Sequence, residues 1–263
     1  MTSVEPSQFY TGLVAQLYAP LRGSVADVDA CERFVRASGQ PALELGCGHG
    51  YPLIELRQRG LDVEGLDSSG DMLDLARAGA RVADVAVVLH HASMETMSLG
   101  TTYQSIFLAG PTFNLLPDDA VAVAALAAIR AHLASGGLVQ IPLFIPQPLK
   151  PEALGFAKQL PTAAGGVMRC TTVSVERDEA ARTQAIMLRY ELDEAGVCTV
   201  VERPWLLHWY TPAGFTALVE AAGLAVVSLT DHRGRPLRDG NWQFVFTLAH
   251  PSVREDSRHA QDS

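Results

Sequence analysis

One stretch, residues 41–77, constrains this chain more than any other; it reads PALELGCGHGYPLIELRQRGLDVEGLDSSGDMLDLAR. The short apolar run at 42–45 is typical of a buried strand. Three glycines follow at alternate positions, and the helix-like segment after them has Pro52 near its start, where a missing N–H costs nothing. A second apolar run, 61–66, ends on Asp67. Strand, glycine turn, helix, strand and acid in this order predict a nucleotide pocket at the carboxyl edge of a parallel sheet.

The rest of the pattern predicts further alternating strands and helices. After Asp67, Ser68 or Ser69 is expected to cap a helix. A later helix is expected to begin at Pro117 and to end at the glycine pair 136–137. The other expected helices span 7–19, 26–37 and 212–222, and the other expected strands span 83–90, 103–109, 138–143, 224–230 and 243–249. This order is typical of a mostly parallel sheet with helices on both faces.

Residues 146–208 depart from the alternation. A loop and a loosely helical segment up to Gly166 come first, and the runs 169–175, 185–192 and 197–207 then alternate like antiparallel strands. We therefore expect a single domain that carries an inserted antiparallel β lid. Its expected parts are a domain over 1–250, N-terminal helices over 1–38, the lid over 146–208 and a flexible tail over 251–263.

Composition excludes several function classes. The net charge is −9, from 29 acidic and 20 basic residues, and an acidic chain without a basic stripe is a poor ligand for nucleic acid. The longest apolar run, near 138–145, is too short to span a bilayer, and the first residues lack the pattern of a signal peptide. We expect a cytoplasmic monomer or homodimer without a metal, because no zinc or disulfide spacing joins the cysteines, which are Cys31, Cys47, Cys170 and Cys198.

The glycine turn itself discriminates between ligands. A dinucleotide turn of the form G-x-G-x-x-G would need a glycine where Tyr51 stands, which disfavours a nicotinamide dehydrogenase. Instead Glu44 precedes glycines at 46, 48 and 50, and Asp67 follows 21 residues after the first of them. This pattern resembles motifs I and II of the class I S-adenosylmethionine-dependent methyltransferases.

The resemblance implies a Rossmann-like fold with a seven-stranded, mostly parallel sheet, an N-terminal helical cover and S-adenosylmethionine as cofactor, with S-adenosylhomocysteine as product. Glycines let the backbone wrap the methionine portion of the ligand without Cβ clashes, and Asp67 can accept two hydrogen bonds from a ribose diol. On this basis we expect the cofactor to be bound by Tyr18, Glu44, Gly46, Cys47, Gly48, Gly50, Asp67, Ser68, Met72, Ser93, Met94 and Ala109.

One departure from the family lies at the adenine end of the expected pocket. The segment 93–104 matches the family in spacing, but Ser93 stands where an acid usually meets the adenine amine, and Gln104 and Ala19 replace two further acids. Met72 and Met94 keep their places beside the adenine face. The substitution at Ser93 predicts a weaker hold on the cofactor, or an adenine contact through backbone or water.

Other segments resemble the small-molecule branch of the family, which methylates amino acids, amino sugars and natural products. The segment 107–119, FLAGPTFNLLPDD, lacks the Asn/Asp-Pro-Pro-Tyr of enzymes that methylate nucleic-acid amines or protein glutamine. Alternation puts Trp205 and Trp209 on one face of a strand and His208 and Tyr210 on the other, and either face can be the core face. The expected acceptor-binding residues are Tyr10, Thr112, Asn114, Trp205, Trp209 and Tyr210, and the candidate catalytic residues are Tyr18 and His208.

The expected reaction is methyl transfer to a nitrogen, oxygen or carbon of a small molecule, by in-line displacement in an enclosed pocket. Bacterial specialised metabolism is the expected setting. An amine acceptor need only arrive neutral, whereas oxygen or carbon benefits from a base. A second hypothesis keeps the fold and the cofactor but replaces methyl transfer with a cyclisation or rearrangement. Accumulation of S-adenosylhomocysteine distinguishes the two.

Overall fold

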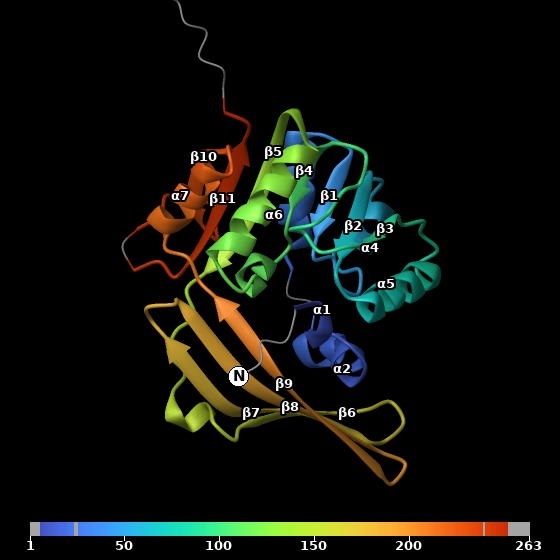
Figure 1. Ribbon diagram of the computed structural model, residues 1–263. Helices are drawn as coiled ribbons and strands as arrows, with labels where there is room; N and C mark the ends of the chain where they lie inside the picture. The colour runs from blue at the N-terminus through green and yellow to red at the C-terminus, as the bar shows by residue number, and fades with distance from the viewer. Residues whose placement is uncertain (1–5, 24–25, 239, 252–263) are drawn as a thin grey trace, which may run out of the picture.

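A seven-stranded sheet lies at the centre of the protein (Figure 1), whose computed structural model describes residues 6–23, 26–238 and 240–251. The strand order is β10-β11-β5-β4-β1-β2-β3. From β5 to β3 all neighbours are parallel, and β11 runs antiparallel to both of its neighbours. The expected mostly parallel sheet is thereby confirmed. Its strands are β1 Ala42–Leu45, β2 Val63–Asp67, β3 Leu89–His91, β4 Tyr103–Phe107, β5 Leu133–Phe144, β10 Ala225–Asp231 and β11 Gln243–Ala249.

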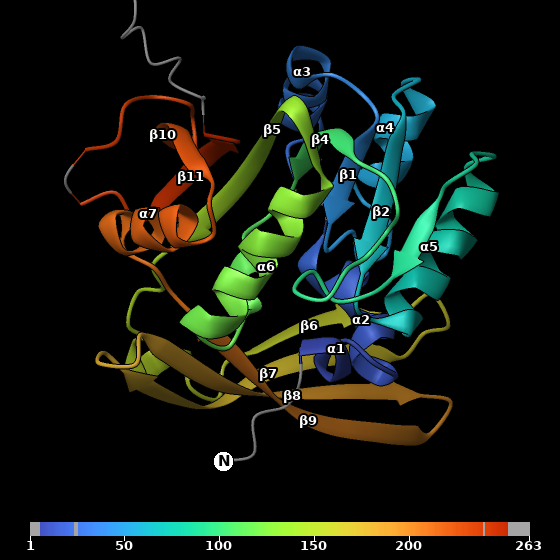
Figure 2. The ribbon, with the colours of Figure 1, turned by 45° about the horizontal axis from the view of Figure 1, so that its top comes forward.

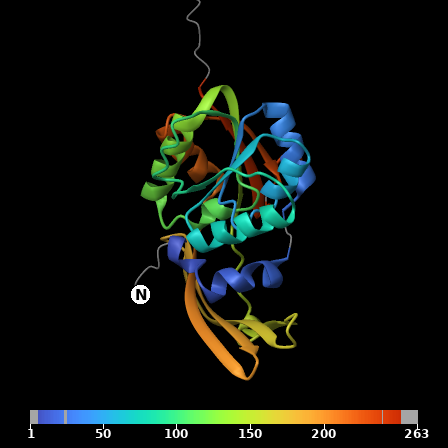
Figure 3. The ribbon, with the colours of Figure 1, turned by 90° about the vertical axis from the view of Figure 1, so that its right-hand side faces the viewer.

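Helices cover both faces of this sheet (Figure 3). One apolar cluster packs three helices against one face of the sheet, and a larger cluster packs two helices against the other face. Four of the five helices begin at a side-chain cap, and the oxygen of Asp27, Ser69, Asp118 or Thr211 accepts a hydrogen bond from a backbone N–H of the first turn. The helices are α3 Val28–Ser38, α4 Leu53–Gln58 and α5 Gly70–Val82 on the first face, and α6 Asp119–His132 and α7 Pro212–Ala221 on the second.

A second, four-stranded antiparallel sheet forms the lid, and we call it the lid sheet. Its order is β6-β7-β8-β9, and its strands are β6 Ala157–Pro161, β7 Val167–Asp178, β8 Thr183–Glu194 and β9 Val197–His208. Helices α1 (Pro6–Phe9) and α2 (Leu13–Arg22) lie between the lid sheet and the central sheet (Figures 1 and 2). Phe9, Val14, Leu17 and Leu21 pack there against Met168 and Tyr190 of the lid sheet. The N-terminal cover and the lid therefore share one apolar core.

The structure corrects the N-terminal helix and the third strand. The helix expected at 7–19 is broken in two, because Gly12 has φ 55° and ψ −127°, far from helical values. The strand expected at 83–90 shrinks to Leu89–His91, since α5 continues to Val82 and a turn follows through Asp84, whose φ is 52°.

Two further corrections concern segments whose structure depends on distant partners. Helix α6 ends at His132 rather than at the glycine pair 136–137, which lies inside β5. In the loosely helical segment expected before Gly166, only Pro151–Ala153 forms a 3-10 turn, and Ala157–Pro161 is a strand because it pairs with β7. The three other expected lid strands are present and longer than expected. Of the tail expected at 251–263, residues 252–263 lie outside the described residues.

Candidate cofactor pocket

The glycine turn after β1 is pinned to the end of β2 by backbone hydrogen bonds. The N–H groups of Gly46 and Cys47 donate to the Leu66 carbonyl oxygen at 2.7 and 3.0 Å. Gly46, Gly48 and Gly50 have φ of 68°, 53° and 91°, which favour glycine. The turn therefore follows a path that a side chain at these three positions would strain.

Asp67, at the end of β2, closes the same turn with its carboxylate. Its Oδ2 accepts a hydrogen bond from the Gly48 N–H at 2.8 Å, and its Oδ1 accepts one from the Ser69 N–H at 2.8 Å. Burial raises the pKa of Asp67, and the two N–H donors oppose that rise. Each carboxylate oxygen has more than one acceptor site, so the group can receive further donors from a ligand.

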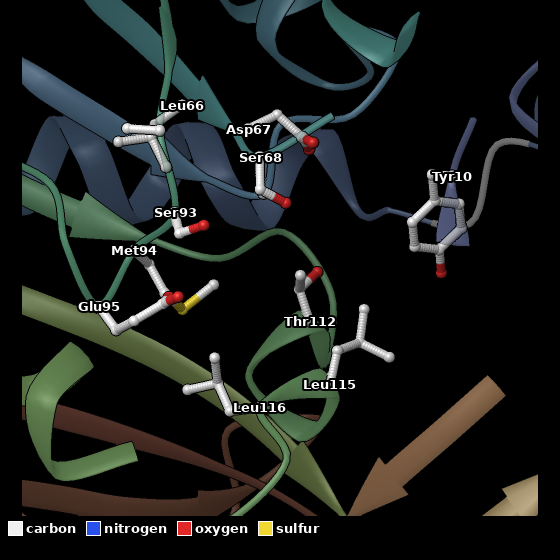
Figure 4. Close-up of a pocket in the computed structure, with 12 residues that line it drawn as sticks. Tyr10, Leu66, Asp67, Ser68, Ser93, Met94, Glu95, Thr112, Leu115 and Leu116 are labelled. Atoms are coloured by element: carbon white, nitrogen blue, oxygen red, sulfur yellow. The ribbon is translucent and has the colours of Figure 1, made fainter. Parts of the chain in front are cut away.

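An open cavity lies beside this carboxylate (Figure 4). It follows the carboxyl ends of β1, β2, β3 and β4, as the sequence predicts. Seven of the expected site residues line it, namely Tyr10, Gly46, Asp67, Ser68, Ser93, Met94 and Thr112. Five lining residues were not expected, namely Leu66, Ala92, Glu95, Leu115 and Leu116. Glu95 had a usable signal in the sequence, since it is an acid two positions beyond Ser93.

Several expected cofactor residues lie behind the lining. Glu44 is 1% exposed, and its Oε2 has no hydrogen-bond partner among the described residues. Burial, and next the charge of Asp67, raise the pKa of Glu44 to about 8. Met72 lies close to Gly48, because a Cβ there would come within 3.2 Å of its Cε. Three more expected cofactor residues lie outside the lining. They are Cys47, which is buried, Gly50, and Ala109, which packs against the apolar cluster between the sheet and helices α3, α4 and α5.

The N-terminal cover brings aromatic rings to one side of the pocket. Tyr10 lines the cavity and packs edge-on against Tyr18, with ring centroids 5.2 Å apart. Tyr18 in turn packs against His49 of the glycine turn at 5.7 Å. The backbone between α1 and α2 is held to the start of α5, since the Ser69 hydroxyl donates to the Tyr10 carbonyl at 2.6 Å and the Gly12 N–H donates to Asp71 Oδ2 at 2.6 Å. This side of the pocket is therefore built by the cover rather than by the sheet.

The remaining expected acceptor residues lie away from this cavity. Trp205 packs with the apolar cluster shared by the cover and the lid. Trp209 is buried beneath the Arg177 guanidinium, 4.1 Å from its ring centroid. Tyr210 is fully buried and packs against Phe113 and Phe215. The structure does not bring these three rings to the cavity wall.

His208, a candidate catalytic residue, lies at the junction of lid and core. It is 2% exposed, its Nε2 is 3.6 Å from Asp119 Oδ1, and its ring packs against Tyr210. Burial, and next the charge of Arg182, lower the pKa of His208. Arg182 also forms an ion pair with Asp119. The residue is separated from the pocket lining and contributes to the connection between α6 and the lid sheet.

Asn114 uses its whole amide for structure. Its Nδ2 donates to the carbonyl oxygens of Phe144 at 3.0 Å and His208 at 2.8 Å, and its Oδ1 accepts from the Phe144 N–H at 3.2 Å. Replacing it with leucine leaves these three backbone groups unpaired, so we expect the free energy of unfolding to fall by at least about 3 kcal/mol. Denaturant unfolding measures this change. The matched change at Asn241, whose Oδ1 accepts one bond in an exposed loop, is expected to have a much smaller effect. Unchanged stability in Asn114→Leu would contradict this structural role.

The space over Gly46 gives a second prediction. A Cβ there would lie 2.6 Å from Thr112 Cγ2, which lines the cavity. We expect Gly46→Val to reduce affinity for S-adenosylhomocysteine by about 100-fold or more, because the turn must move toward the ligand or Thr112 must move away. Calorimetric titration measures the affinity. Gly100→Val is the control, since Gly100 also has positive φ but open space around it. Equal affinities for the two variants would contradict a role for this close approach.

Comparisons with known proteins agree with this geometry. Residues 42–137, which hold the glycine turn, Asp67 and the loop after β3, match the family described as a methyltransferase domain. This chain is a class I S-adenosylmethionine-dependent methyltransferase. A curated relative, the dTDP-3-amino-3,6-dideoxy-alpha-D-glucopyranose N,N-dimethyltransferase of Streptomyces fradiae, is 28% identical to the methyltransferase over 233 residues, which cover 84% of this chain and 87% of the relative.

Solved structures share the architecture of the methyltransferase. The CcbJ methyltransferase of Streptomyces caelestis superposes with a TM-score of 0.75 at 23% identity, and the match covers 94% of this chain and all of that one. CalS10 of Micromonospora echinaspora, an amino pentose methyltransferase solved with bound S-adenosylmethionine, has a TM-score of 0.64 at 25% identity and covers 90% and 97%. The matches include the lid, so this layout is shared rather than peculiar to the chain.

The pocket of the methyltransferase has the features that its cofactor requires. A buried carboxyl oxygen of Glu44 lacks a partner, a cradle at Gly46 excludes a side chain, and Asp67 lies beside an open cavity. Among the described residues no group of His, Cys, Asp and Glu could hold a metal ion, and no helix is long and apolar enough to cross a membrane. The unpaired Glu44 oxygen, the close approach at Gly46 and the Asp67 carboxylate fit an organic cofactor that forms hydrogen bonds.

Proposed function

We propose that this methyltransferase transfers a methyl group to an amine of a small sugar-bearing molecule in bacterial specialised metabolism. The relative that matches over 84% of the chain carries the proposal, because its name specifies N,N-dimethylation of an amino sugar nucleotide. CalS10, whose name specifies an amino pentose and calicheamicin biosynthesis, supports the same class of acceptor. The net charge of −9 disfavours a nucleic-acid acceptor.

The proposal assigns the cofactor to the residues around the glycine turn. Asp67 accepts hydrogen bonds from the ribose diol, and the Glu44 carboxyl group faces the ammonium group at the methionine end. That ammonium group supplies the positive charge that a buried carboxylate needs as a partner. The glycine turn leaves room for the methionine chain, and Met94 covers the base. Bound there, S-adenosylmethionine supplies an electrophilic methyl group on a sulfonium, so the protein needs to position and enclose the acceptor.

The acceptor enters beside the N-terminal cover in this proposal. Tyr10 and Thr112 line the cavity on the side where Tyr18 also lies. Aromatic edges and a hydroxyl can orient an acceptor amine so that it lies about 3–3.5 Å from the carbon that it attacks. Exclusion of water by the cover strengthens the attraction between these dipoles and the redistributed charge. With these residues, methyl transfer requires only that the acceptor amine enter the pocket unprotonated, so that its nitrogen can act as the nucleophile.

A labelled-methyl assay tests the proposal. The protein is incubated with S-adenosylmethionine that carries a labelled methyl group and with a panel of nucleotide-linked amino sugars, glycosides with free amines, phenols and indoles. We expect label in one or more amino sugars, together with an equal amount of S-adenosylhomocysteine. Label in phenols or indoles alone would contradict the amine, and consumption of an acceptor without S-adenosylhomocysteine would indicate a cyclisation or rearrangement instead.

A further inference from the structure

Arg203 is a half-buried cation on the inner, apolar face of the lid sheet. Because side chains alternate along β9, Arg203 lies on the same face as Val201 and Trp205, which pack against the core shared by the cover and the lid. Its partner across the sheet is Leu188, which also packs against that core. A charged group among apolar neighbours costs free energy unless an oppositely charged group compensates it. The position of Arg203 therefore calls for an anion.

The described part of the protein supplies no such anion. Among the described residues no carboxylate pairs with Arg203, and its guanidinium donates one hydrogen bond, at 3.1 Å, to the carbonyl oxygen of the neighbouring Glu202. The Glu202 side chain lies on the outer face, where it pairs with Arg189 at 2.6 Å. An arginine has five N–H donors, so most of the donors of Arg203 are left for a ligand or for water.

A groove between the cover and the lid sheet adjoins this guanidinium, and we call it the cover–lid groove. It is lined by Gln8 and Thr11 of the cover and by Glu202, Arg203 and Pro204 of β9. Helix α1 lies against β9 at this place (Figures 1 and 2). Among the described residues that line the groove, Arg203 is the only cation, and the acid Glu202 is already paired.

A short segment of the cover separates this groove from the cofactor pocket. Tyr10 lines the cavity beside Asp67, whereas Gln8 and Thr11, which flank Tyr10 in the sequence, line the cover–lid groove. The cavity lining, as far as the described residues form it, contains no Lys, Arg or His. An acceptor whose amine lies near Tyr10 and whose other end is anionic therefore finds its cation in the groove, at Arg203.

We propose that Arg203 binds a phosphate group of the acceptor in the cover–lid groove and so selects phosphorylated acceptors. The inference rests on the proposed function, since it places the acceptor amine beside Tyr10. A guanidinium presents its N–H donors in a planar fork that matches two phosphate oxygens, and it stays charged at every physiological pH. The cover thus separates two tasks, with methyl transfer on one side and recognition of the anionic end on the other.

Thymidine diphosphate and uridine diphosphate serve as probes of this contact. Each is titrated calorimetrically into the protein saturated with S-adenosylhomocysteine, and we expect at least one of them to bind. Arg203→Gln is expected to weaken that binding by about tenfold to 100-fold, because hydrogen bonds between charged groups are strong. Thymidine and uridine, which lack the phosphates, are expected to bind the variant and the unaltered protein with affinities within about threefold of each other.

Two further variants distinguish a ligand contact from a structural one. Arg169→Gln removes a cation of the outer face of the same sheet, where Arg169 donates to Gln159 at 3.4 Å, and is expected to leave the affinity within about twofold. Arg203→Leu places an apolar side chain among apolar neighbours. It is expected to lose diphosphate binding while its melting temperature stays equal or rises. A melting temperature lower by several degrees in both Arg203 variants would assign the guanidinium to the packing of the lid instead.

The outcomes that contradict this inference differ from those that contradict the proposed function. Unchanged diphosphate affinity in Arg203→Gln, or no measurable binding of either diphosphate to the unaltered protein, would overturn the role of Arg203. In the labelled-methyl assay, methylation confined to amines without a phosphate would also overturn it and leave the proposed function in place. Absence of S-adenosylhomocysteine with every acceptor amine would overturn the proposed function itself.

Discussion

Asp67→Ala is expected to lower the affinity for S-adenosylhomocysteine by about 100-fold or more. The proposed ribose contact provides two hydrogen bonds to a charged acceptor, each of which contributes about 1.5–3 kcal/mol. The change also removes the acceptors of the Gly48 and Ser69 N–H groups, so the glycine turn keeps only its backbone hydrogen bonds to the Leu66 carbonyl as a connection to β2. Calorimetric titration measures the affinity, and a thermal melt shows whether the variant remains folded.

Two controls isolate the ribose contact from the support of the turn. Asp67→Asn keeps an acceptor oxygen for one backbone N–H, so its melting temperature is expected to lie near that of the unaltered protein while its affinity still falls. Asp74→Ala removes an exposed acid of α5 whose partner is Arg77, and it is expected to leave both properties unchanged. Affinity for S-adenosylhomocysteine that survives intact in Asp67→Ala would remove Asp67 from the site.

The glycine turn was predictable because its geometry is encoded locally. Three glycines at alternate positions and an acid at the next strand end specify a backbone path that few other residues permit, and that path is present, with Asp67 bound to the Gly48 N–H. Strands β1, β2 and β11 were likewise predictable from short apolar runs bounded by turn residues. In each case the interactions that determine the structure form between residues close in sequence, or between neighbouring strands of a common sheet pattern.

The far wall of the pocket was not predictable in the same way. Leu115 and Leu116 read as ordinary core residues, and they line the cavity only because the segment after β4 folds back beside the loop after β3. Asn114, Trp209 and Tyr210 were expected to bind the acceptor because their segments resemble those of the small-molecule branch of the family. Their burial depends on contacts between lid and core across many residues of sequence, such as Asn114 to the His208 carbonyl. Side-chain chemistry alone does not distinguish a polar group that a ligand satisfies from one that the backbone satisfies.

Glu44 is expected to couple cofactor binding to the release of a proton, because its carboxyl group lies buried without a charged partner. Burial and the charge of Asp67 raise its pKa to about 8, and Cys31 and Cys47 are the other titratable groups that feel its charge. At pH 7 the free protein therefore holds a proton on Glu44. An ammonium group that binds beside it favours the charged carboxylate and drives that proton off.

We expect binding of S-adenosylhomocysteine at pH 7 to release close to one proton, and Glu44→Gln to abolish that release and lower the affinity by about tenfold to 100-fold. Titration calorimetry in two buffers of different ionisation enthalpy measures the released protons. The ligand-free variant provides an independent check. Folded Glu44 keeps its proton up to about pH 8 while the unfolded chain loses it near 4.5, so the folded state binds more protons in this window and its stability falls as pH rises through it. Glu44→Gln should flatten that decline. A variant that melts with an unchanged pH dependence, yet releases the same number of protons on binding, would show that another group carries the charge.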